Sequence, residues 1–248
     1  MHSTQRKALI ATLNPGSEFF IAGLQKTSLI DYPGKVSCVV FLAGCNFTCP
    51  YCHNPELALG RYPERIDLKT LLAFIAQRRS LLDAVVISGG EPTLRTGLGG
   101  LCRQLRNLGM AVKLDTNGSR PSAIETLLRE NLVDFIAMDL KTAPEEYGPP
   151  LCDEDAGPAV LRSINIIMTA GVDYEFRTTC VHPFVDETRM RSMAVTVQGA
   201  RRLVLQRFNP RKTLDSGFES HSQAGLSLER MKALKRLASP FVKSCSIR

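Results

Sequence analysis

The chain has 248 residues, of which 44% are hydrophobic, so it can bury a sizeable core and has a length normal for a single α/β barrel. It contains no run of about eighteen or more apolar residues and no secretory leader at its N-terminus, so we expect a cytoplasmic protein without a membrane-spanning helix. The net charge of +7 suits an acidic partner or is simply a solvated basic surface, and no motif with interleaved aromatic residues indicates nucleic acid.

In chain order, short apolar runs alternate with amphipathic stretches of helical period. We expect strands at residues 37–44, 84–90, 111–118, 133–141, 172–181 and 201–210. Helices are expected at residues 67–79, with Asp67 as N-cap, and at 98–109, 121–131, 159–171, 186–199 and 227–238. Residues 241–248 could form one more strand, and the irregular segment 143–158 is interpreted as a surface excursion. This alternation predicts a parallel sheet with helices outside, either doubly wound or closed into a barrel.

The most unusual residues follow the ends of the predicted strands, where ligands bind in parallel α/β folds. A cysteine cluster comes directly after the first strand. The later strands end in G-G-E-P at 89–92, D-T-N-G at 115–118, D-L-K at 139–141 and E-F-R-T-T at 175–179. Strand alternation puts Lys113, Asp115 and Asn117 on one face, and similar charged faces recur on the next two strands. The pattern predicts one site for a polar, charged ligand.

The cysteine cluster consists of Cys45, Cys49 and Cys52 in the spacing C-x₃-C-x₂-C. The chain has eight cysteines in all, but its size and its lack of a secretory signal argue against a disulfide framework. One interpretation is structural zinc with His53 as a fourth ligand. The other is a [4Fe–4S] cluster, in which three cysteines leave one iron open to a substrate or cofactor.

The cysteine spacing, with the aromatic Tyr51 inside it and G-G-E-P after the second strand, resembles the radical S-adenosylmethionine (SAM) enzymes. The resemblance implies a [4Fe–4S] cluster on Cys45, Cys49 and Cys52, and SAM bound to its open iron. It also implies a partial (β/α)6 barrel with parallel strands and outer helices. We expect residues 20–248 to form this radical SAM domain and residues 1–19 to be a mobile extension.

The same resemblance assigns SAM contacts to the residues at the strand ends. These are Tyr51, Gly89, Gly90, Glu91, Asp115, Asn117, Asp139, Lys141 and Arg177. Several of them have a plainer interpretation. Glu91 could be a helix-start charge, residues 115–118 a hairpin turn, Asp139 and Lys141 an ion pair, and Arg177 the partner of Glu175.

The segment L-Q-K-T-S-L-I-D-Y-P-G-K-V-S-C-V-V-F-L-A-G-C-N-F-T-C-P-Y-C-H-N-P-E-L resembles the activating enzymes of glycyl-radical proteins, most closely those of anaerobic ribonucleoside-triphosphate reductase. This implies an oxidoreductase that removes a glycine Cα hydrogen from that partner, with a flavodoxin-type electron donor. No catalytic residue beyond the cluster and SAM is implied. Other activases carry D-G-P-G before the first strand, where this chain has D-Y-P-G, and Asp31 is expected to hold the target's glycine loop.

Two further functions stay open at this point. The chain could be a radical SAM enzyme that acts on a small molecule or an RNA base, which the basic charge favours mildly. It could also be a zinc-binding module without enzymatic activity. A glycyl radical signal in electron paramagnetic resonance would distinguish activation of a reductase from action on a small molecule or RNA. Colourless protein that contains zinc and no iron would favour the zinc-binding module.

Overall fold

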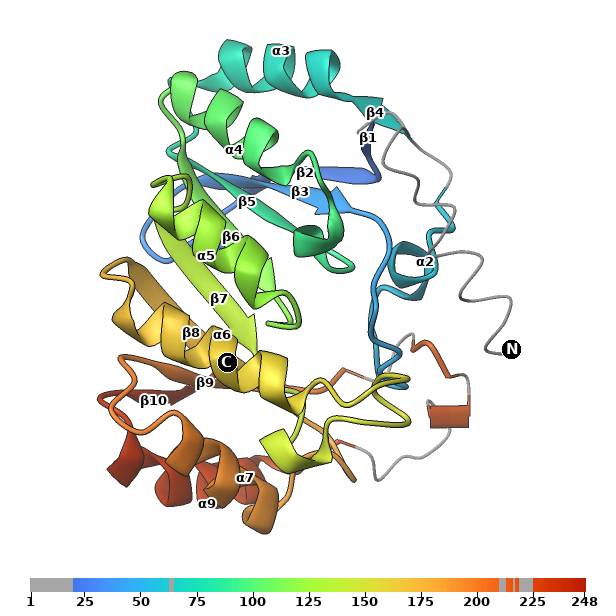
Figure 1. Ribbon diagram of the computed structural model, residues 1–248, viewed down its shortest axis with the longest axis vertical. Helices are drawn as coiled ribbons and strands as arrows, with labels where there is room; N and C mark the ends of the chain where they lie inside the picture. The colour runs from blue at the N-terminus through green and yellow to red at the C-terminus, as the bar shows by residue number, and fades with distance from the viewer. Residues whose placement is uncertain (1–19, 63–64, 210–212, 216, 219–224) are drawn as a thin grey trace. The chain divides into compact units, whose positions relative to one another are not determined.

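The computed structural model describes residues 20–62, 65–209, 213–215, 217–218 and 225–248 (Figure 1). The extension expected at residues 1–19 lies outside the described residues. The chain divides into two compact units, and the single domain expected for residues 20–248 stays a prediction. Unit 1 comprises Met1–Asn46, Glu56–Asp115 and Thr126–Asp134, and unit 2 comprises Phe47–Pro55, Thr116–Glu125 and Phe135–Arg248.

The strands of unit 1 form a mainly parallel sheet built from the expected apolar runs. β3 (Ser37–Leu42) pairs in parallel with β5 (Ala84–Gly89), and β5 pairs in parallel with β6 (Ala111–Thr116). Most of their side chains are buried, which is typical of parallel strands covered on both faces. The first three predicted strands are therefore confirmed.

Unit 1 also contains strands that the sequence analysis missed. β2 (Gly23–Ser28) pairs antiparallel with β3, and the short strands β1 (Phe20–Ile21) and β4 (Ile66–Asp67) pair with each other. β2 carries polar, exposed side chains at its centre, because it lies at the edge of the sheet beside β3. An edge strand of this kind has no apolar run to reveal it in the sequence.

The helices of unit 1 begin and end close to their predicted positions. α3 (Leu68–Arg78) starts after Asp67, whose carboxylate accepts a hydrogen bond from the Thr70 N–H at 2.6 Å, so the predicted N-cap is confirmed. α4 (Leu98–Asn107) follows the short 3₁₀ turn η1 (Pro92–Leu94) and contacts α3. The four-residue helix α2 (Pro55–Ala58), which was not predicted, follows the cysteine cluster.

The strands of unit 2 are all parallel. β7 (Phe135–Asp139), β8 (Asp173–Cys180), β9 (Leu203–Arg207) and β10 (Cys245–Ile247) pair in that order. β10 is the extra strand that was left open at 241–248. Figure 1 shows these four strands side by side in order of sequence.

The helices of unit 2 connect its strands. α6 (Gly157–Thr169) joins β7 to β8, α7 (Glu187–Thr196) joins β8 to β9, and α9 (Leu228–Ala238) leads through η3 (Ser239–Phe241) to β10. α7 and α9 contact each other. α5 (Pro121–Arg129), between β6 and β7, spans the division between the two units.

The fold class is confirmed as α/β, with a mostly parallel sheet and outer helices. Each of the six predicted strands is present, followed by the helix or turn that returns the chain to the next strand. Within the described parts of the chain, no helix combines the length and the apolar character needed to cross a bilayer.

Candidate functional site

The start of the cysteine loop is fixed by backbone hydrogen bonds in unit 1. The Gly44 N–H donates to Leu57 O at 2.6 Å, and the Cys45 N–H donates to Ala58 O at 3.1 Å. Leu57 and Ala58 belong to α2. After β3 the chain therefore runs beside α2, and the two hydrogen bonds to this short helix hold the backbone of Cys45 in place.

The glycines at the end of β5 allow that strand to approach β3 closely. The Gly90 N–H donates to Leu42 O and the Glu91 N–H to Gly44 O, both at 2.8 Å. A Cβ on Gly89 would lie 2.0 Å from Leu42 O, and one on Gly90 would lie 2.2 Å from Gly44 O. Any side chain at position 89 or 90 would therefore clash with the backbone of the neighbouring chain segment. The sequence analysis attributed these glycines to the approach of a ligand, whereas the structure gives a reason within the protein.

Glu91 is fully buried and caps the turn η1. Its carboxylate accepts a hydrogen bond from the Thr93 N–H at 3.1 Å and another from the Thr93 hydroxyl. The plainer interpretation of Glu91, a charge at the start of a helical turn, is therefore confirmed. Its expected contact with SAM stays a prediction.

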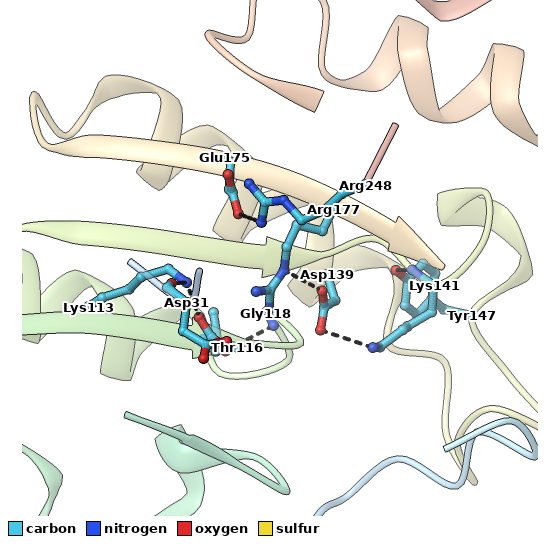
Figure 2. A network of polar contacts seen from close by, with 11 residues as sticks. Asp31, Lys113, Thr116, Gly118, Asp139, Lys141, Tyr147, Glu175, Arg177 and Arg248 are labelled. Carbon is cyan, nitrogen blue, oxygen red and sulfur yellow. Dashed lines mark hydrogen bonds and ion pairs between the residues drawn. The ribbon is translucent and has the colours of Figure 1, made fainter. Parts of the chain in front are cut away.

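A buried lysine connects two of the predicted site residues in unit 1. Lys113, in β6, is only 1% exposed, and its ammonium lies 2.9 Å from Asp115 Oδ1. The same ammonium donates to the backbone oxygen of Asp31 at 2.5 Å (Figure 2). The Asp31 carboxylate accepts a hydrogen bond from the Ser28 hydroxyl. Asp31 and Asp115 thus belong to one polar group through Lys113.

Asp31 and Cys45 lie at opposite ends of β3. Asp31 follows β2, whose last residue, Ser28, pairs with Ser37, the first residue of β3. Cys45 comes after the last residue of β3. Asp31 is therefore separated from Cys45 along the sheet by the length of β3, but the shared contact with Lys113 brings the Asp31 backbone close to Asp115.

The second part of the cysteine loop is packed into unit 2. The Cys52 N–H donates to Cys49 O at 3.0 Å, which closes a turn around the buried Tyr51. The Tyr51 ring lies 5.1 Å from the Phe184 ring. Burial raises the pKa of the Cys49 thiol to about 11, although the positive charge of Lys141 opposes that rise.

His53 has partners other than the cysteines. Its Nε2 lies 2.6 Å from Asn209 O, and its ring stacks on Phe208 at 5.4 Å. Among the described residues, no group of three or more His, Cys, Asp or Glu side chains forms a preassembled metal site. Cys45 belongs to unit 1, whereas Cys49 and Cys52 belong to unit 2.

The segment around Asn117 is a tight turn into α5. The Asn117 side-chain oxygen accepts a hydrogen bond from the Ser119 N–H at 2.9 Å, and Gly118 has a positive φ of 76°. The Ser163 hydroxyl donates to Gly118 O at 2.6 Å. A helix follows this turn, so the alternative of a hairpin is wrong.

Asp139 lies between two cations in unit 2. Its Oδ1 is 2.9 Å from Arg177 Nε and its Oδ2 is 3.1 Å from Lys141 Nζ, so the ion pair considered from the sequence is present (Figure 2). Burial raises the pKa of Asp139, but Arg177 and Lys141 outweigh it and lower the pKa to about 2. Burial lowers the pKa of Lys141, but Asp139 and Cys49 outweigh it and raise that pKa. This cation–carboxylate–cation group carries one net positive charge.

One interpretation of the sequence paired Glu175 with Arg177, and the structure shows a different partner for each. Its buried carboxylate lies 3.4 Å from Arg248 NH1, while Arg177 turns to Asp139 (Figure 2). Arg248 is next to β10, which pairs with β9, and β9 pairs with β8. The C-terminal strand therefore brings a cation to Glu175 and leaves Arg177 to the group around Asp139.

The model of the radical SAM superfamily matches residues 39–196, more than half of the chain. The chain belongs to the radical SAM superfamily. Membership implies that this radical SAM enzyme uses a [4Fe–4S] cluster and SAM. The matched range includes the cysteine loop and the ends of β5, β6, β7 and β8, where the polar residues described above lie.

Related proteins extend the similarity of this radical SAM enzyme beyond the matched range. A protein of Methanocaldococcus jannaschii, whose name assigns it provisionally to glycyl-radical enzyme activation, is 34% identical over 239 residues, which cover 92% of this chain and 95% of the relative. A pyruvate formate-lyase-activating enzyme of Clostridium pasteurianum is 27% identical over 131 residues, 51% of this chain and 54% of the relative.

A solved structure shares the fold of this radical SAM enzyme. The crystal structure of Streptococcus suis SuiB with its precursor peptide SuiA matches with a TM-score of 0.64 at 12% identity. The match covers 84% of this chain and 47% of SuiB, so the chain spans about half the length of that protein. At this identity the similarity concerns the fold alone.

Sequence reasoning missed several residues that support the site of this radical SAM enzyme. Lys113 was noted only for the face it shares with Asp115, although a lysine within a buried strand is itself a signal of a buried partner. Arg95 donates to Ala43 O, two residues before Cys45. Tyr147 lies in the segment interpreted as a surface excursion, yet it is buried, so that interpretation is wrong for this residue.

Proposed function

We propose that this enzyme activates a glycyl-radical protein, and that its partner is anaerobic ribonucleoside-triphosphate reductase. The observation that carries glycyl-radical activation is the similarity to the M. jannaschii relative along nearly the whole of both chains. The choice of the reductase as partner rests on the resemblance of the segment around the cysteine cluster. A small-molecule enzyme of the same superfamily would need to share only the core of the fold. The D-Y-P-G turn and the cysteine loop lie within the region of similarity to activating enzymes that the sequence indicated.

Cys45, Cys49 and Cys52 would hold the [4Fe–4S] cluster. Thiolates are the ligands that iron–sulfur clusters require, and these three provide one fewer ligand than the cluster has irons. The positive charge of Lys141 acts on both Cys49 and Cys52 and offsets part of the effect of burial, which raises the pKa of the Cys49 thiol. Three cysteines fit a cluster with one open iron, whereas a closed zinc site would need a fourth ligand, and the candidate His53 contacts Asn209 O instead.

Lys141 and Arg177 would bind the carboxylate of SAM. Together with Asp139, which contacts both of them, they form a group with one net positive charge, which favours an anionic ligand. Asp139 and Asp115 would balance the positive charges of SAM. When bound, the cluster would supply one electron and SAM the 5′-deoxyadenosyl group, the chemistry needed to remove a Cα hydrogen atom from a glycine of the partner.

Other expected SAM contacts involve Tyr51, Gly89, Gly90, Glu91 and Asn117. Glu91 is already engaged by Thr93, so we expect it to act mainly by shaping the turn after β5. Tyr51 and Asn117 are buried polar residues that would exclude water from SAM and orient it. No general base is required, because the reaction transfers a hydrogen atom rather than a proton.

Asp31 would contact the glycine loop of the partner. Its carboxylate is oriented by the Ser28 hydroxyl, and its backbone oxygen by Lys113. A carboxylate held in this way can accept hydrogen bonds from the backbone of an extended loop. Its connection to Asp115 through Lys113 supports a partner loop that reaches the predicted SAM site.

The test is electron paramagnetic resonance under anaerobic conditions. The reconstituted enzyme is incubated with a reductant, SAM and the anaerobic reductase, and we expect a glycyl radical signal on the reductase. Omission of SAM, or replacement of the reductase glycine by alanine, should abolish the signal. If the enzyme cleaves SAM but a competent reductase shows no radical, the partner assignment is wrong and a small-molecule or RNA substrate is favoured. If it binds zinc and no iron, radical SAM chemistry by this chain is excluded.

A further inference from the structure

The segment that follows β7 contains a buried tyrosine next to the group around Asp139. Tyr147 comes directly after the short turn η2 (Pro144–Glu146), and its side chain is 2% exposed. Pro144 and Leu151 of the same segment are also buried. The segment therefore packs against unit 2 and does not project into solvent.

Two tyrosine hydroxyls hold the backbone of Lys141 from opposite sides of the residue. The Lys141 N–H donates to Tyr147 Oη at 2.7 Å, and Figure 2 shows the two residues side by side. The Tyr51 hydroxyl donates to Lys141 O at 3.4 Å. Tyr51 lies between Cys49 and Cys52 in the sequence. The backbone of Lys141 is thus connected both to the cysteine loop and to the segment that contains Tyr147.

The same segment also holds the cysteine loop directly. The ring of Tyr147 lies 6.0 Å from the ring of Phe47. The Thr48 N–H donates to Leu151 O at 2.6 Å, and the Thr48 hydroxyl donates to Pro150 O at 2.7 Å. Phe47 and Thr48 immediately precede Cys49, so these contacts set the backbone position from which the second cysteine of the cluster extends.

α7 fixes the other side of the segment. Arg189 Nε donates to Glu146 Oε2 at 2.6 Å, and the Ser192 hydroxyl donates to Glu145 Oε1 at 2.9 Å. Both glutamates lie in the turn η2 directly before Tyr147. The tyrosine is therefore supported by a helix on one side and contacts Lys141 and the cysteine loop on the other.

From these contacts we infer that Tyr147 is a positioning residue, which aligns Lys141 with the thiols of Cys49 and Cys52. The inference rests on the proposed function of Lys141 as a ligand of SAM. Tyr147 acts through the backbone of Lys141 and through Phe47, and it takes no part in the reaction itself. Without its hydroxyl, the Lys141 N–H loses this acceptor, and of the two tyrosine bonds only the longer one from Tyr51 still holds the backbone of Lys141.

The test compares Tyr147→Phe with Tyr174→Phe. Tyr174 is a matched control, because it is also buried in unit 2 and its hydroxyl also accepts a backbone hydrogen bond, from the Arg201 N–H at 3.2 Å. The first measurement is amide hydrogen exchange on the full chain without cofactors. We expect exchange at Lys141 to become about tenfold faster in Tyr147→Phe and to stay unchanged in Tyr174→Phe.

The second measurement is SAM cleavage by the reconstituted enzymes. We expect Tyr147→Phe to raise KM for SAM about tenfold, with kcat changed less than about threefold, because binding and not chemistry is altered. Thr48→Val, which removes the hydroxyl bond to Pro150, should raise exchange of the Thr48 N–H, which donates to Leu151 O, and tests the contact of the same segment with the cysteine loop without changing Tyr147.

The outcomes separate this inference from the proposed function. Unchanged exchange at Lys141 in Tyr147→Phe would overturn the positioning role, as would an equal effect of Tyr174→Phe on KM. If the wild-type protein neither binds iron nor cleaves SAM, the proposed function fails. In that case the exchange measurement alone still decides whether Tyr147 holds the backbone of Lys141.

Discussion

At the scale of single residues, the three cysteines of the loop are the expected cluster ligands. Single replacement of Cys45, Cys49 or Cys52 by alanine is expected to lower the iron content of the anaerobically reconstituted protein from about four atoms per chain to fewer than about one. Iron and sulfide analysis provides the measurement. Cys245→Ala is the control, since this thiol lies in β10 and is not an expected ligand. Full iron retention in a loop variant would remove that cysteine from the ligand set.

Asp139 gives a prediction for the dependence of stability on pH. Its pKa in the folded protein is about 2, below the ordinary value of 3.8, so the folded state favours the ionised form. Its contribution is complete above about pH 4 and is lost as the pH falls through about 2. We expect Asp139→Asn to lower the free energy of unfolding by about 2 kcal/mol at pH 7, and this difference should narrow below pH 4.

Urea denaturation at a series of pH values measures this effect. The control is Glu125→Gln, which removes the exposed ion pair between Glu125 and Arg162 and should change stability by less than about 0.5 kcal/mol. A difference between wild type and Asp139→Asn that stays constant down to pH 3 would show that the two cations do not stabilise the ionised carboxylate.

The sequence was informative about residues whose function depends on neighbours in the chain. The cysteine spacing and the pairing of Asp139 with Lys141 are local patterns, and the parallel strand ends brought Arg177 to the same place. Contacts between distant residues could not be predicted. The bond from Lys113 to Asp31 joins residues that are 82 positions apart, and it depends on where the turn after β2 lies.

At the scale of elements, the junction of β3 and β5 depends on two glycines. Gly90→Ala would place a Cβ against the oxygen of Gly44, and since that atom belongs to the backbone it cannot move aside easily. We expect a loss of about 3 kcal/mol or more in the free energy of unfolding, measured with urea.

Gly100→Ala is the matched control in the same unit. A Cβ at Gly100, within α4, would meet no atom within 4 Å, and its φ is not positive. Alanine there should raise the stability by up to about 1 kcal/mol. Similar losses for both variants would mean that the glycines after β5 are not needed for close packing.

The strength of an element's apolar pattern decided whether it could be predicted. β3, β5 and β7 are buried along nearly their whole length, and each corresponds to an apolar run in the sequence. β2 has exposed polar residues at its centre, so its pairing with β3 was not visible. Pairing of an edge strand depends on backbone hydrogen bonds, which the side chains do not encode.

At the scale of the whole molecule, the net charge of +7 bears on the source of the electron. A flavodoxin-type donor is acidic, so attraction should accelerate its encounter with this enzyme. We expect the rate of cluster reduction by reduced flavodoxin to fall at least about tenfold when the salt concentration rises from about 0.05 to 0.5 M. Stopped-flow absorbance measures the rate.

Reduced methyl viologen provides the control for this prediction, because it is a cation. Its rate of reduction should stay constant or rise as salt screens its repulsion from the basic protein. A flavodoxin rate that is independent of ionic strength would indicate that the positive charge of the chain does not steer the donor.

The hydrogen bonds between Leu42, Gly44 and the residues after β5 have a consequence for how the enzyme is loaded with metal. Gly90 and Glu91 donate to Leu42 and Gly44, and Ala58 accepts from Cys45, all through backbone atoms. Backbone hydrogen bonds therefore constrain the chain at and beside Cys45. A ligand constrained in this way loses less conformational entropy on binding iron than one in an unconstrained loop. We expect these hydrogen bonds to favour insertion of the cluster into a folded chain.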